Sequence, residues 1–136
     1  MKYSLVLLSF FYITCKSHVN NTEPHNNPLL DEVMVIHDKV MPETATIHTY
    51  IRELKDLNLH EAKDIIYLNI QSLEMADEAM MSWMADFKVP EDSILVKDYL
   101  TLEKNKISNI SDGMYVAIKR ARIVIDSLKV TEKIKK

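Results

Sequence analysis

Four methionines and one histidine could together form a soft metal-binding site. Met34, His37 and Met41 recur at steps of three and four residues, which places them on one face of a helix. Met80 and Met84 lie four residues apart on a later stretch. Thioethers with an imidazole suit Cu(I), and a histidine with a methionine can ligate haem in a bundle. These five side chains are therefore a candidate copper or haem site.

The same residues also have a simpler interpretation as packing. Methionine is a flexible side chain that fills irregular cores, and Pro42 would create such an irregularity in the first helix. A histidine on an apolar face usually hydrogen-bonds a neighbour, and Asp77 and Tyr99 are the candidates for His37. We favour packing and expect no cofactor, with copper or haem binding as the alternative.

The metal hypothesis requires a helical hairpin that turns near Asn58. Counting equal numbers of residues away from that turn places His37 level with Ala79, and Met41 level with Met75. The first helix would then bring Met34, His37 and Met41 beside the stretch that contains Met75, Met80, Trp83 and Met84.

Three long helical stretches must position these side chains. Apolar residues at three- and four-residue steps predict helices from just after Pro28 to Leu54, from about His60 to Phe87, and from Glu91-Asp92-Ser93 onward. The apolar face stays in phase across Pro42, so we expect a kink there. Short connections between long helices favour antiparallel neighbours. The predicted fold is all-α: an antiparallel, up-down-up three-helix bundle with heptad-like, left-handed packing.

The composition excludes several classes of protein. Gly113 is the only glycine among 136 residues, too few for a β-rich domain or a phosphate-binding glycine loop. Its place within a helix suggests a close approach of a neighbouring helix. A formal net charge of −3 argues against a nucleic-acid partner. No nucleophile and base with an orienting third group is evident, so we expect the protein not to be an enzyme.

The only cysteine, Cys15, ends a short apolar run that follows Lys2. The run Leu5–Ile13 is shorter than the roughly 20 residues that cross a bilayer, and it is typical of the central region of a secretory signal peptide. Residues 16–28 are polar, with two prolines and four asparagines, which is typical of a flexible tether. An incidental cysteine after an ordinary signal, or a membrane-embedded N-terminal helix, is the alternative.

The four residues Tyr12-Ile13-Thr14-Cys15 resemble a loose bacterial lipobox, with tyrosine and threonine in place of the usual aliphatic and smaller residues. In that motif, the cysteine becomes the lipidated first residue of the mature chain. The resemblance implies acylation of Cys15, which would explain a lone cysteine in an exported chain. Several acyl chains make a durable membrane anchor.

Two further segments extend the resemblance over most of the mature chain. Residues 30–42, LDEVMVIHDKVMP, and residues 76–87, ADEAMMSWMADF, are similar to a group of small Bacteroidetes lipoproteins often labelled "viral A-type inclusion protein". The resemblance implies a secreted, lipidated, helical protein and brings no catalytic residues with it.

These observations predict a signal peptide at residues 1–14, a lipidated cysteine and tether at 15–28, and a bundle at 29–136. The expected protein is a lipid-anchored, periplasm-facing component of the bacterial cell envelope. It would be a non-enzymatic binding or structural module, with the membrane and another envelope protein as its partners.

Overall fold

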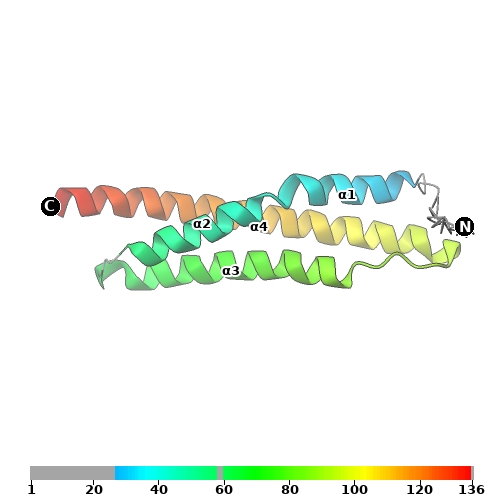
Figure 1. The fold of residues 1–136 in the computed structure, drawn as a ribbon, viewed down its shortest axis with the longest axis horizontal. Coiled ribbons are helices and arrows are strands. Elements are labelled where there is room, and N and C mark those ends of the chain that lie inside the picture. Colours follow the sequence, from blue (N-terminus) through cyan, green and yellow to red (C-terminus); the bar gives the residue numbers. More distant parts are fainter. Residues whose placement is uncertain (1–26, 58–59, 136) are drawn as a thin grey trace, which may run out of the picture.

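The computed structural model describes residues 27–57 and 60–135, which form an all-α bundle (Figure 1). Its elements are α1 (Pro28–Val40), α2 (Glu43–Asp56), the short 3₁₀ helix η1 (His60–Ala62), α3 (Lys63–Asp86) and α4 (Ser93–Lys135). The predicted helical bundle is thus confirmed. The predicted signal peptide, Cys15 and nearly all of the tether lie outside the described residues.

Local side-chain chemistry begins the first and last helices where the sequence predicts. The Asn27 side chain accepts hydrogen bonds from the backbone N–H groups of Leu29 and Leu30, at 3.1 and 3.4 Å, and Pro28 occupies the first turn. Asp92 accepts from the N–H of Ile94 at 2.9 Å at the start of α4. Both side chains satisfy donors that have no partner within the helix.

Pro42 produces the expected kink between α1 and α2 (Figure 1). Proline has no N–H to donate, and its ring clashes with the preceding turn. The backbone nevertheless stays in the right-handed helical region at both Met41 and Pro42. The N–H of Thr44 reaches the carbonyl of Met41 at 3.2 Å, a tighter three-residue bond. The result is a bent helical unit instead of two independent helices.

The core follows a seven-residue spacing in each long helix. Four buried residues of the α1–α2 unit are spaced by seven, and the phase is kept across the kink: Val33, Val40, Ile47 and Leu54. The other two helices contribute Ile66, Leu73, Met80 and Trp83 from α3, and Leu100, Ile107, Met114, Ala117, Ala121 and Ile125 from α4. This spacing confirms the apolar faces that the sequence predicts.

The 43-residue α4 is the helix on which the others pack. α1 packs chiefly on α4, whereas α2 packs on both α3 and α4. Figure 1 shows the chain reversing direction between α2 and α3 and again between α3 and α4, with the C-terminal end of α4 extending past the other helices. An ion pair of 2.7 Å between Lys129 and Glu53 joins the C-terminal half of α4 to α2.

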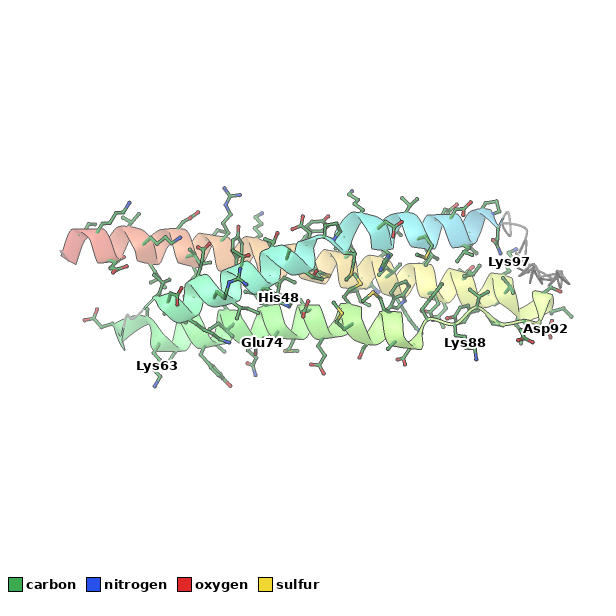
Figure 2. All side chains as sticks on the ribbon, in the orientation of Figure 1. His48, Lys63, Glu74, Lys88, Asp92 and Lys97 are labelled. Carbon is green, nitrogen blue, oxygen red and sulfur yellow. The ribbon has the colours of Figure 1, made fainter. Side chains whose placement is uncertain are left out.

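Charged side chains project from the outside of the bundle. Figure 2 shows Lys63, Lys88 and Asp92 directed away from the bundle, and all three are exposed. The expectation for Gly113 is wrong, because a Cβ atom built on it would meet no atom within 4 Å. Gly113 borders open space and does not mark a close helix approach.

Candidate functional site

His37, in the last turn of α1, is the centre of the most distinctive polar arrangement in the core. Its side chain is 16% exposed. Nδ1 lies 2.8 Å from a carboxylate oxygen of Asp38, and Nε2 lies 3.3 Å from the sulfur of Met84 on α3. The partners expected for His37, Asp77 and Tyr99, are therefore wrong. Tyr99 instead accepts a hydrogen bond from the N–H of Lys88 at 2.7 Å.

The contacts of His37 restrict the proton arrangement of its ring. An ionised carboxylate can only accept, so Nδ1 carries the proton toward Asp38. In the neutral ring, Nε2 then presents a lone pair to a sulfur that is itself an acceptor. This pair of acceptors is satisfied by a second ring proton, as in imidazolium, or by a soft cation held between nitrogen and sulfur.

The other four predicted metal ligands differ in how far their side chains are buried. Met80 is fully buried, while Met34, Met41 and Met84 are half-buried. Of these methionines, Met84 makes the contact with the His37 ring. Among the described residues, no group of three or more His, Cys, Asp or Glu side chains could hold a metal ion. Any metal at His37 would therefore depend on thioether ligands.

The prediction that the first helix lies beside the stretch with Trp83 and Met84 is confirmed for His37, which contacts both residues. The residue-by-residue register of the hairpin differs from the prediction. His37 contacts Met84, five residues beyond Ala79. The 3₁₀ helix η1 precedes α3, so a count that assumes ideal helix on both sides of Asn58 does not hold. Met75 is also misplaced by the prediction: it is 64% exposed and lines an outer groove against α4. The expected meeting of Met41 and Met75 is accordingly wrong.

Trp83 joins the His37 site to a buried carboxylate on α4. Its ring centre lies 5.7 Å from that of His37 and 4.9 Å from that of Phe87. The indole Nε1–H donates to Glu103 at 2.8 Å, and Lys106 donates to the other oxygen of Glu103 at 2.7 Å. The hydrogen bond that Lys106 donates to Glu103 raises the pKa of Lys106, because it favours the charged ammonium.

Glu103 is the polar site residue that sequence reasoning missed. It is 4% exposed, the only buried charged residue in the described part of the chain. Its signal is positional: it lies three residues after Leu100 and four before Ile107, on the apolar face of α4. A carboxylate there requires partners, which Trp83 and Lys106 supply.

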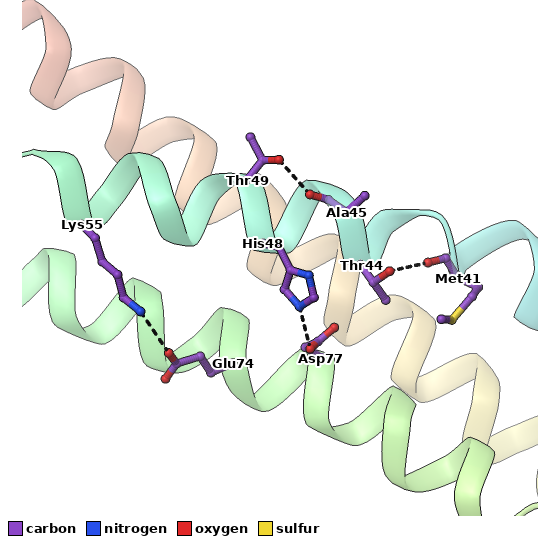
Figure 3. A network of polar contacts seen from close by, with 8 residues as sticks. All are labelled: Met41, Thr44, Ala45, His48, Thr49, Lys55, Glu74 and Asp77. Carbon is purple, nitrogen blue, oxygen red and sulfur yellow. Dashed lines mark hydrogen bonds and ion pairs between the residues drawn. The ribbon is translucent and has the colours of Figure 1, made fainter.

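A second histidine is fixed at the boundary between α2 and α3. Figure 3 shows His48 directed at Asp77, with Nε2 and the carboxylate oxygen 3.0 Å apart. The other oxygen of Asp77 is buried without a hydrogen-bond partner. Further along the same interface, Lys55 and Glu74 form an ion pair of 3.8 Å (Figure 3). Because the His48 side chain is 54% exposed, this pair forms the edge of the α2–α3 interface.

Comparison with protein-family models, curated proteins and solved structures gives no match for this chain. Within residues 27–57 and 60–135, no helix combines the length and apolar character needed to cross a bilayer.

Proposed function

We propose that this chain is a lipid-anchored protein of the bacterial cell envelope whose helical bundle is a non-enzymatic binding or structural module. The observation that carries the proposal is the apolar run Leu5–Ile13, which ends close to the only cysteine, Cys15. A helix with a side-chain cap begins at Pro28, so residues 16–27 separate the acylation site from the bundle. Acylation would hold the bundle near the periplasmic face of a membrane.

Replacing Cys15 by serine is expected to abolish acyl labelling and to release the protein from membranes, because serine offers no thiol for the lipid. The measurement is metabolic labelling with an alkyne fatty acid, followed by membrane sedimentation. A matched control moves the cysteine two positions, with Cys15→Ser and Ser17→Cys together. An anchored parent chain and a released control support the proposal. A parent chain that takes up no label and partitions like the serine variant would contradict it.

The second candidate function is Cu(I) binding, favoured by the 3.3 Å separation of the His37 Nε2 atom and the Met84 sulfur. In the neutral ring, this contact brings together two acceptors from facing helices, the ring nitrogen and the thioether sulfur. Met41 follows the last residue of α1, four positions after His37, and is half-buried. It is a further candidate thioether ligand. Soft donors of this kind select Cu(I) over harder ions.

Exchanging Met84 for leucine is expected to weaken Cu(I) binding by about tenfold or more, since it removes the thioether and keeps the volume. The measurement is competition with a chromophoric Cu(I) chelator under reducing conditions. Met75→Leu is the matched control, because Met75 lies on the outer face of α3 and is 64% exposed. Equal affinity in the parent, Met84→Leu and Met75→Leu chains would eliminate the copper proposal.

A further inference from the structure

Two apolar residues are exposed at the end of the bundle where α4 begins. Ile94 and Leu95 lie in the first turn of α4 and are 82% and 56% exposed. Because Cβ atoms point toward the N-terminus of a helix, side chains in this turn lean toward the end of the bundle. We call residues 88–97 the α3–α4 tip. The described residues leave most of its apolar pair open to the surroundings.

The start of α1 lies at this same end of the bundle (Figure 1). Asn27, which caps α1, and Leu30 border a cavity of about 460 Å³. The α3–α4 tip supplies the rest of its lining: Val89, Pro90, Glu91, Ser93 and Val96. The chain that precedes the described residues therefore joins the bundle beside the α3–α4 tip.

The proposed anchor indicates which surface this tip meets. Twelve residues, 15–26, separate the acylation site from Asn27, and they span at most about 40 Å. The opposite end of α4 lies about 60 Å from the tip, the length of a 43-residue helix. Anchoring at Cys15 would therefore hold the α3–α4 tip close to the bilayer, at a high effective concentration.

The charges of the α3–α4 tip fit a zwitterionic lipid surface. Lys88 and Lys97 balance Glu91 and Asp92, so the formal charge of residues 88–97 is zero. Figure 2 shows three of these four residues, Lys88, Asp92 and Lys97, at this end of the bundle. Headgroups that carry both signs of charge can pair with both kinds of side chain.

Backbone donors of the tip already have partners inside the chain. The N–H of Lys88 donates to the Tyr99 hydroxyl at 2.7 Å, and the N–H of Ile94 donates to the Asp92 carboxylate at 2.9 Å. The N–H of Leu95 donates to the Asp92 carbonyl at 3.1 Å. Since unpaired amides are strongly disfavoured in hydrocarbon, this pairing lowers the cost of bringing the tip into lipid.

We propose that the α3–α4 tip inserts Ile94 and Leu95 into the headgroup–acyl boundary of the bilayer that carries the Cys15 lipid, so that the bundle stands end-on. This inference rests on the proposed lipid anchor. Moving the two apolar side chains out of water is favourable, and the anchor reduces the cost of bringing the tip to the surface. An end-on bundle leaves its sides open to another envelope protein.

The test couples the full-length chain through Cys15, its only thiol, to a maleimide lipid in phosphatidylcholine vesicles. The chain is then held at Cys15 whether or not a cell acylates it, so a failure here is distinct from a failure of the proposed anchor. Ile94→Trp and Ile134→Trp each add one indole, at opposite ends of α4. The two positions are 82% and 80% exposed, and Trp83 adds the same buried background to both chains.

Lipids brominated on their acyl chains serve as the quencher. Quenching is expected to be at least about twofold stronger for Ile94→Trp, because side chains at the interface lie about 5–10 Å into the headgroup–acyl boundary. Any affinity of the added indole itself for the interface is the same in both chains. Quenching of Ile134→Trp that equals that of Ile94→Trp, or no quenching of either chain, would overturn the proposal.

Leu95→Asp, added to the Ile94→Trp chain, supplies a second test. It is expected to reduce the quenching to the level of the Ile134→Trp chain, because a carboxylate opposes entry into an apolar phase. Leu102→Asp is the matched control, since Leu102 is 53% exposed on the same face of α4 but lies beyond the tip. It should leave the quenching unchanged. Equal losses from the two substitutions would mean that α4 lies along the bilayer, and end-on insertion would be wrong.

Discussion

Replacing Trp83 by alanine is expected to destabilise the bundle by about 3–5 kcal/mol, the cost typical of truncating a buried tryptophan. Trp83 is 6% exposed, and its ring packs between those of His37 and Phe87. The truncation removes these contacts and leaves Glu103 without the indole donor that now reaches it. The cost therefore combines a cavity with a buried carboxylate oxygen that has lost its donor, while Lys106 still pairs with the other oxygen.

Urea unfolding followed by circular dichroism measures this effect, since Trp83 is the only tryptophan and fluorescence is lost with it. Trp83→Phe is the matched control: it keeps an aromatic ring and removes the indole N–H. We expect a smaller loss for phenylalanine than for alanine. If alanine cost less than about 1 kcal/mol, Trp83 would not be a packing centre of this end of the bundle.

The helices and their buried faces could be predicted because periodicity alone determines them. Val33, Val40, Ile47 and Leu54 keep a seven-residue spacing across Pro42, so the sequence reveals both the face and its continuity through the kink. Start signals such as Asn27 and Asp92 act over two or three residues and are equally local. Fold class therefore follows from short-range chemistry repeated along the chain.

The contacts between helices were harder to predict because they depend on the connections. A residue count about Asn58 treats both sides of the turn as ideal helix, whereas Leu57 is extended and residues 60–62 form a 3₁₀ helix. The error shifts His37 from Ala79 to Met84. The count also ignores the side of the helix on which each side chain lies. Met75 follows Leu73 by two residues, about 200° around α3, and so faces outward.

Glu103 shows a different limit of sequence reasoning. Its position on the apolar face of α4 is visible in the sequence, but its partner Trp83 lies on another helix, twenty residues away. Only the packing of α3 on α4 decides whether that carboxylate is buried and paired or displaced to water. Helical periodicity alone therefore could not predict the polar part of the candidate site.

Replacing Glu103 by alanine is expected to cost about 1–3 kcal/mol, because the indole N–H of Trp83 would remain buried without its acceptor. Glu103→Gln separates the two contacts of the carboxylate. The amide oxygen can still accept from Trp83, and only the ion pair with Lys106 is lost. Since the Lys106 side chain is 51% exposed, that pair contributes little, and we expect Gln to cost less than about 1 kcal/mol.

A double-mutant cycle with Trp83→Phe measures how much of the Glu103→Ala cost comes from the indole hydrogen bond. In the phenylalanine background, Glu103→Ala removes a carboxylate that has already lost its Trp83 donor, so its cost should be smaller than in the parent chain. We expect a coupling energy of about 1 kcal/mol from the four unfolding curves. Additivity within about 0.3–0.5 kcal/mol would mean that Glu103 acts through Lys106 or through packing, and not through the Trp83 contact.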